Sequence, residues 1–236
     1  MLSLPPLPDA WPFEARKACG ELKQIDSSFL PGLAGGWHIY VNSDISDLAA
    51  GMNLDGTFGR GCIIRAGGYI LRPYRRGGIL RFFNKDTYLT SNRFRNEYLV
   101  HASLWKVGYP TVEPVGYAFR RLSCGVEGVF ITRWVDSRPW PRTWGSNDPS
   151  GQISEIARLI KSLSDWRLWA PDMNATNFIV ETSGQVLALD WDMAKWTKQG
   201  SLISKYWARL KRSMIKLDAP EELIDSVRRR LIGGPA

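Results

Sequence analysis

The sequence predicts an α+β protein of two lobes, with a strand-rich N-terminal lobe that carries one helix and a helix-rich C-terminal lobe. The 236 residues are 44% hydrophobic and 23% charged, which is typical of a globular protein and not of a disordered or fibrous one. Short β-branched and aromatic runs dominate the first half, whereas apolar residues at helical spacing dominate the second half. A turn-rich stretch at 137–151 separates the two halves.

The N-terminal lobe is expected to span residues 1–134, of which 1–35 form a possible N-terminal extension. One helix is expected from Asn92 to Val107, because apolar residues line one side of it and Gly108 and Pro110 end it. The expected strands are short runs separated by glycines, at 37–41, 62–65, 69–72, 115–119 and 129–134.

The C-terminal lobe is expected to span residues 135–236. Apolar residues recur at helical spacing over 153–163, and long helical patterns extend from about Ser201 to Leu231. Between these regions, two short apolar runs at 178–180 and 186–189 flank a turn at Ser183-Gly184. This pattern predicts a β-hairpin.

Polar residues gather at the open end of this hairpin. A turn centred between Ser183 and Gly184 would place Asn177 beside Asp190, and Asp172 precedes Asn177 by five residues in the loop that enters the hairpin. Mg²⁺ takes oxygen ligands from one or two carboxylates together with substrate phosphates. The remaining carboxylate can accept a proton from an attacking hydroxyl, so this end of the hairpin is a candidate phosphoryl-transfer site.

A second candidate region is rich in glycine. Gly59, Arg60 and Gly61 stand between two expected antiparallel strands, where backbone N–H groups can approach phosphate oxygens; an ordinary glycine-rich hairpin turn is the alternative. The next turn, at Gly67-Gly68, would place Arg72 opposite Ile63, close to this loop. Arg72 would thereby supply a cation beside the phosphates.

Asp-x(4)-Asn followed by a hairpin and Asp resembles the protein-kinase-like arrangement of a catalytic aspartate with a metal-binding asparagine and aspartate. The resemblance implies these roles for Asp172, Asn177 and Asp190, in that order. It also implies that Arg72 stands where a lysine is usual and that Glu97, in the predicted helix, is its ion-pair partner. A solvent-facing Glu97 is the alternative.

Three segments resemble the lipopolysaccharide core kinases, most closely the family of 3-deoxy-D-manno-octulosonic acid (Kdo) kinases. They are 70–80, with its Tyr-Arg-Arg-Gly-Gly run; Asp172-Met-Asn-Ala-Thr-Asn-Phe-Ile together with Leu189-Asp-Trp-Asp; and 207–216. The resemblance implies Mg²⁺-dependent transfer of the γ-phosphate of ATP to a hydroxyl of Kdo-lipid A. Asp192, Arg75 and Arg76 are possible acceptor or second-metal residues.

The sequence departs from the family pattern at one position near the site. The family has a histidine two residues before the catalytic aspartate, whereas Ala170 and Pro171 precede Asp172 here. A side chain that normally supports the loop is therefore missing. The base and the two candidate metal ligands remain.

Charge and composition indicate the partners. The net charge of +8 and the pI near 9.5 favour a polyanion, which by charge alone could be nucleic acid, anionic lipid or a phosphorylated substrate. The resemblance implies an anionic acceptor on an anionic inner-membrane surface, and no nucleic acid. No run approaches the roughly 18 apolar residues of a membrane span, and a secretory signal is not expected. The protein is therefore expected in the cytoplasm, peripheral on the inner face of the inner membrane. Scattered cysteines and two histidines disfavour a disulfide framework or a zinc site.

Two alternatives stay open. A kinase of the same class could act on another acceptor, such as a core heptose, an aminoglycoside or a protein. A catalytically silent module could bind nucleotide or a polyanion without transferring phosphate, and the missing histidine and the unusual Arg72 favour this alternative. The oligomeric state does not follow from the sequence.

Overall fold

The computed structural model describes residues 22–26, 36–42, 57–58, 63–74, 91–123, 125–145, 149–198 and 200–233. These residues fall into two compact units. The first contains the described residues before 104 together with 113–134, and the second contains 104–112 and the described residues from 135 onward. Each unit is described by itself below.

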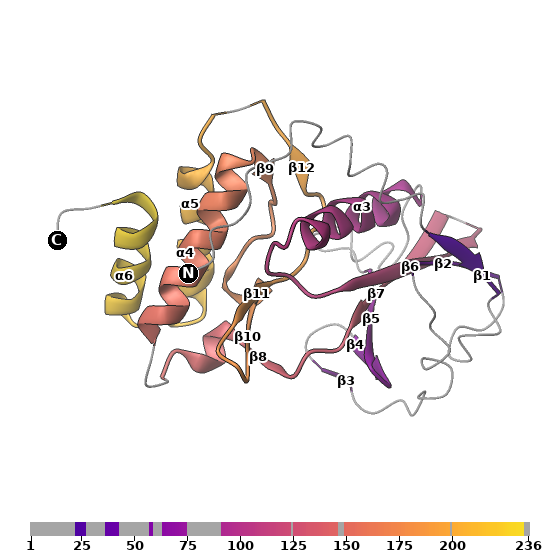
Figure 1. Ribbon diagram of the computed structural model, residues 1–236, viewed down its shortest axis with the longest axis horizontal. Coiled ribbons are helices and arrows are strands. Elements are labelled where there is room, and N and C mark those ends of the chain that lie inside the picture. The colour runs from indigo at the N-terminus through magenta and orange to yellow at the C-terminus, as the bar shows by residue number, and fades with distance from the viewer. Residues whose placement is uncertain are drawn as a thin grey trace. The chain divides into compact units, whose positions relative to one another are not determined.

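The first unit is built on an antiparallel sheet of seven strands in the order β1-β2-β6-β7-β5-β4-β3. Figure 1 shows these strands with helix α3, Asn92–Lys106. Five strands lie at or next to the predicted positions: β2 Trp37–Val41, β4 Ile63–Ala66, β5 Tyr69–Pro73, β6 Pro114–Leu122 and β7 Gly125–Arg133. The other two, β1 Lys23–Ile25 and β3 Thr57–Phe58, were not predicted.

The register of β4 and β5 confirms the predicted position of Arg72. Ile64 pairs with Leu71 across the Gly67-Gly68 turn, and the same register continued by one residue places Arg72 opposite Ile63. Gly67 has a φ of 56°, the left-handed conformation that glycine adopts without a steric penalty. The predicted phosphate-binding residues Gly59, Arg60 and Gly61 lie outside the described residues, as do Arg75 and Arg76.

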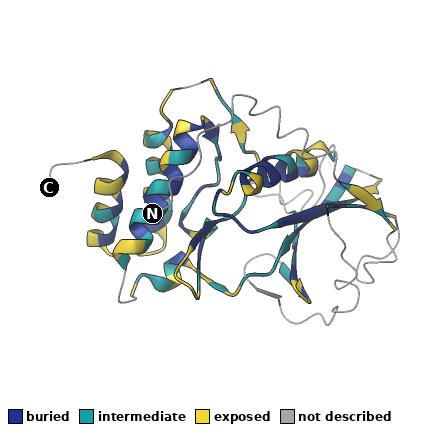
Figure 2. Ribbon diagram, viewed as in Figure 1, coloured by how far each residue is buried: buried dark blue, intermediate teal, exposed yellow. Residues whose placement is uncertain are grey.

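Helix α3 packs on one face of this sheet, and Figure 2 shows buried residues along it. The helix approaches the sheet closely at Gly128, where a Cβ atom would lie 2.5 Å from Cζ of Phe94. The opposite face buries a separate cluster that includes Leu71. Because side chains alternate along a strand, Arg72 lies on the face that packs against α3. The α3 face is aromatic; it contains Tyr74, Phe94, Tyr98, Ala102, Tyr117, Val126 and Phe130.

The second unit contains three helices that lie side by side (Figure 1): α4 Pro149–Asp165, α5 Ile203–Lys216 and α6 Glu221–Ile232. The helical pattern predicted for 201–231 therefore divides in two. Asp218, with a φ of 55°, and Pro220 break it, because proline lacks an N–H and cannot continue the preceding helix. No helix among the residues described is long and apolar enough to span a bilayer.

The predicted hairpin is present as β10, Phe178–Glu181, and β11, Val186–Ala188, with β8, Ser137–Pro139, on the other side of β10. Short elements complete the unit: β9 Leu168–Trp169 paired with β12 Lys195–Trp196, and the 3-10 turns η4 Trp140–Thr143 and η5 Ala175–Asn177.

The predicted register of the hairpin is wrong by one residue. Phe178 pairs with Ala188, and the Leu189 N–H donates to the Asn177 carbonyl at 2.7 Å, so Asn177 lies opposite Leu189 and not Asp190. The turn holds three residues, 182–184, closed by the Glu181 N–H on the Gln185 carbonyl, and this odd number moves its centre to residue 183.

Candidate active site

The predicted site residues that the structure describes form two groups. Arg72 and Glu97 belong to the first unit, and Asp172, Asn177, Asp190 and Asp192 belong to the second. Each group has its own geometry.

In the first group, the Arg72 guanidinium forms an ion pair with Glu97. Arg72 reaches α3 from strand β5, and its guanidinium carbon also lies 5.3 Å from the ring centre of Tyr74 and 5.7 Å from that of Phe130. The Glu97 side chain is 1% exposed and the Arg72 side chain 29% exposed. The alternative of a solvent-facing Glu97 is therefore wrong. A buried carboxylate needs such a partner, and Arg72 keeps part of its surface accessible to a ligand.

In the second group, the loop from Asp172 to Asn177 folds around a main-chain oxygen. The Asn177 side-chain amide donates to the Asp172 carbonyl at 2.7 Å, and the Asn174 amide donates to the same oxygen at 2.8 Å. Because the Asn177 amide nitrogen makes this bond, its Oδ1 remains an acceptor with a fixed orientation. This oxygen is of the kind that Mg²⁺ prefers.

The carboxylate of Asp172 contacts a residue of the 207–216 segment that was not predicted as a site residue. Arg209, on α5, donates from Nη2 to Asp172 Oδ1. Both side chains are partly exposed, 45% for Asp172 and 38% for Arg209. The candidate base is therefore held in place and remains accessible to solvent.

Asp190 leaves the hairpin directly after Leu189, the partner of Asn177. Its φ is 63°, which is uncommon for a residue with a side chain. Its Oδ1 accepts the Asp192 N–H at 3.3 Å. Conformations of this kind cost of order 1 kcal/mol or more and concentrate at functional sites. Asn177 and Asp190 thus stand at the same end of the hairpin, although not directly opposite each other.

Trp191, which stands between Asp190 and Asp192, anchors this part of the chain. Its indole N–H donates to Thr111 Oγ1 at 3.1 Å, and the Thr111 hydroxyl donates to the Ala188 carbonyl at 2.7 Å. Both Thr111 and Trp191 are almost fully buried. The segment on either side of the aromatic ring is therefore tied to the core of the second unit.

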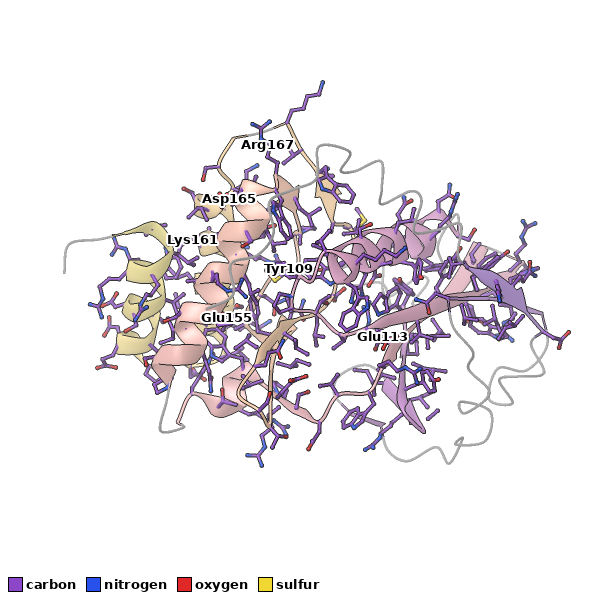
Figure 3. All side chains as sticks on the ribbon, in the orientation of Figure 1. Tyr109, Glu113, Glu155, Lys161, Asp165 and Arg167 are labelled. Atoms are coloured by element: carbon purple, nitrogen blue, oxygen red, sulfur yellow. The ribbon has the colours of Figure 1, made fainter. Side chains whose placement is uncertain are left out.

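Tyr109 extends this packing to α4. The Tyr109 side chain is labelled in Figure 3. Its ring meets the Trp191 ring edge-on, with centroids 5.4 Å apart, and its hydroxyl donates to the Leu159 carbonyl at 3.3 Å. Burial raises the pKa of the Tyr109 hydroxyl well above its usual value, with the neighbouring Tyr206 as a second cause. The hydroxyl therefore stays protonated and acts as a hydrogen-bond donor.

Two further residues missed from the sequence, Tyr206 and Ser213, bind the loop from α5. The Tyr206 hydroxyl accepts the Ala170 N–H at 3.0 Å and donates to the Leu168 carbonyl. Ser213 Oγ accepts the Ala175 N–H at 2.8 Å. Their spacing with Arg209 along one helix face was the signal that could have revealed them.

The oxygen donors of this loop and hairpin fit Mg²⁺. Asn177 Oδ1 and the Asp190 carboxylate are hard ligands, too few to enclose an ion alone but sufficient when substrate phosphates complete its shell. Within the described part of the chain, no group of three or more His, Cys, Asp or Glu residues could hold a metal ion without such help. A softer metal that requires histidine or thiolate ligands does not suit this donor set.

Comparison with curated proteins bears on the family. The Kdo kinase of Xylella fastidiosa strain M12 is 27% identical to this chain over 177 residues, which are 69% of this chain and 68% of that protein. The Kdo kinase of Actinobacillus succinogenes is 29% identical over 161 residues, 62% of this chain and 65% of that protein. This chain is a relative of the Kdo kinases. No family model matches it.

Two solved structures align with this chain at low sequence identity. The bifunctional kinase-methyltransferase WbdD aligns with 74% of this Kdo kinase relative and 43% of its own chain, at 13% identity and a TM-score of 0.43. The ROP18 kinase domain aligns with 90% of this chain and 73% of its own, at 10% identity and the same TM-score, 0.43. At these TM-scores the alignments carry no argument, and the likeness to the Kdo kinases comes from the sequence alone.

Proposed function

We propose that this Kdo kinase relative is an ATP-dependent kinase of lipopolysaccharide core biosynthesis that phosphorylates a hydroxyl of Kdo on lipid A. One observation carries the kinase chemistry: the Asn177 amide holds the carbonyl of Asp172, and the hairpin brings Asp190 to the same end. The names of the curated relatives supply the acceptor.

In this proposal Asp172 orients the acceptor hydroxyl and accepts its proton. Asn177 Oδ1 and the Asp190 carboxylate hold Mg²⁺, which neutralises charge on the phosphates when it is bound. Asp192, whose N–H bonds to Asp190, supports the position of that carboxylate and is a candidate for a second metal or for the acceptor. Phosphoryl transfer depends mainly on the positions of the reacting groups and on the neutralisation of phosphate charge. The main contribution of this chain is therefore a loop that holds Asp172 and Asn177 in fixed positions.

The first unit contributes phosphate binding. Arg72, paired with Glu97 and 29% exposed, is proposed to contact phosphate oxygens, because a planar guanidinium fits phosphate geometry. Gly59, Arg60 and Gly61 are proposed to cover the phosphates with their backbone N–H groups. Arg75 and Arg76 are proposed to bind the anionic acceptor.

A peripheral position on the inner membrane is part of the proposal. At the C-terminal end of α5, Ile215 is 55% exposed and Leu217 37% exposed, and Lys211 and Lys216 are exposed beside them. Apolar side chains next to lysines suit the surface of an anionic bilayer. Sedimentation with anionic but not neutral vesicles is the expected result.

The proposal is tested by incubating the purified protein with ATP, Mg²⁺ and Kdo-lipid A and measuring the acceptor by mass spectrometry. The expected result is a mass gain of one phosphate on Kdo-lipid A and none on lipid A without Kdo. Transfer to a core heptose or an aminoglycoside instead would show that the proposed acceptor is wrong and that the proposed kinase activity is right. Thermal stabilisation by Mg·ATP without any transfer would indicate a silent nucleotide-binding protein.

A further inference from the structure

We infer that helix α5 positions the catalytic loop through three side chains, and that Arg209 is a positioning residue that sets the orientation of the Asp172 carboxylate. The inference rests on the proposed function for the role of Asp172. It concerns residues that stand on one face of α5: Tyr206, Arg209 and Ser213 follow one another at intervals of three and four positions.

Tyr206 holds the start of the loop. Its hydroxyl bridges the Leu168 carbonyl and the Ala170 N–H, the latter at 3.0 Å, two residues before Asp172. Burial raises the pKa of Tyr206, so the hydroxyl remains a donor to the carbonyl. The ring also packs on Trp169, with centroids 5.0 Å apart. The hydroxyl thus supports the position at which the family pattern has a histidine and this chain has Ala170.

Ser213 holds the other end of the loop. Its Oγ accepts the Ala175 N–H at 2.8 Å and donates to the Leu210 carbonyl within α5 at 2.8 Å. Ala175 begins the η5 turn that leads to Asn177. The loop is therefore bound to the same helix before and after Asp172.

Arg209 lies between these two contacts along α5 and reaches the reactive carboxylate itself. It engages Oδ1 of Asp172, which leaves Oδ2 to accept the proton of an acceptor hydroxyl. A guanidinium presents its N–H donors in a fixed plane, so this contact sets the orientation of the Asp172 carboxylate. The Asp172 side chain is half-exposed, and its ion pair with Arg209 limits the rotation of the carboxylate.

Helix α5 is rigid enough for this task. Leu202, Leu210 and Met214 are buried to 0% exposure, and the Leu202 N–H at its start donates to Ser164 Oγ of α4 at 2.8 Å. A side chain that extends from a packed helix holds its partner more precisely than one that extends from a loop.

Kinetic measurements on Arg209→Met test the inference. With Kdo-lipid A as the acceptor, kcat is expected to fall on the order of a hundredfold, because misplacement by about 1 Å has that effect, while KM for Mg·ATP stays within about twofold. Arg209→Lys restores a cation and is expected to recover part of the loss. Arg228→Met, an exposed arginine on α6, removes the same charge and should leave kcat unchanged.

Three outcomes would overturn the positioning role. They are a wild-type kcat in Arg209→Met, an equal loss of kcat in Arg228→Met, and an effect of Arg209→Met on acceptor KM alone. The last outcome would indicate that Arg209 binds the acceptor and does not orient the carboxylate.

Hydrogen exchange separates a failure of this inference from a failure of the proposed function, because it needs no acceptor. Tyr206→Phe should speed exchange of the Ala170 N–H, and Ser213→Ala should speed that of the Ala175 N–H, each at least several-fold. If these amides respond but wild-type protein transfers no phosphate to Kdo-lipid A, the proposed acceptor is wrong and the support from α5 stands. If wild-type protein is active and neither amide responds, the inference is wrong.

Discussion

Replacing Thr111 by valine should destabilise the second unit, although valine has nearly the same shape as threonine. The Thr111 hydroxyl donates to the Ala188 carbonyl at 2.7 Å and accepts the Trp191 indole N–H at 3.1 Å. All three residues are at most 1% exposed. The change therefore removes one hydrogen bond from each of two buried polar groups.

The expected magnitude follows from that geometry. A buried polar group that loses its partner costs about 1–3 kcal/mol, so Thr111→Val should lower the free energy of unfolding by about 2–4 kcal/mol. Thr111→Ser keeps the hydroxyl and loses one buried methyl group, which costs about 1 kcal/mol. Hydrogen bonding thus predicts that the valine variant is less stable than the serine variant. Packing alone predicts the reverse order.

Urea unfolding followed by tryptophan fluorescence measures both variants against the wild-type chain, which has 11 tryptophans as reporters. Because Trp191 stands between Asp190 and Asp192, the valine variant should also gain less thermal stability from Mg·ATP. A valine variant as stable as the serine variant would refute the reasoning.

Four further changes test the site and the fold. Asp190→Ala should abolish phosphoryl transfer, and near-wild-type transfer in the lipid assay would contradict its role as a metal ligand. Asp172→Asn should lose turnover but keep thermal stabilisation by Mg·ATP, since its loop contacts use the main-chain carbonyl; loss of both would count against a role limited to the base. Glu97→Gln replaces a charged partner of Arg72 and should raise KM for Mg·ATP about tenfold, as initial rates would show. Gly128→Ala should lower stability to urea by about 1–3 kcal/mol, because its Cβ would lie 2.5 Å from Phe94, and an unchanged midpoint would argue against this close packing.

Features that depend on short-range patterns could be predicted from the sequence. The run at 37–41 is a strand at its predicted bounds, and the helix predicted from Asn92 to Val107 ends one residue earlier. The Gly67-Gly68 turn fixed the register of β4 and β5, and alternation along β5 then placed Arg72 on the α3 face, where Glu97 meets it. Each of these steps rests on few residues that lie close in sequence.

The register of the β10–β11 hairpin could not be predicted from the local sequence pattern. Ser183-Gly184 suits a two-residue turn, but it also suits a three-residue turn with glycine in the last, left-handed position. The structure has the second form, with Gly184 at a φ of 86°. Ser183 and Gly184 are compatible with both turns. The length of the turn is therefore decided by how the strands pack on each other and on their neighbours. A shift of one position separated Asn177 from direct pairing with Asp190.

The contacts of α5 could not be derived from local patterns at all. Tyr206, Arg209 and Ser213 bind residues 36 to 38 positions earlier in the chain. In sequence Arg209 and Ser213 read as polar positions of an ordinary amphipathic helix, whose apolar positions, such as Tyr206 and Leu210, enter the core. The segment 207–216 was marked by its resemblance to the Kdo kinases, and not as a support for the loop. In the structure Leu210 of this segment is buried in the core, while Arg209 and Ser213 bind the loop that carries Asp172.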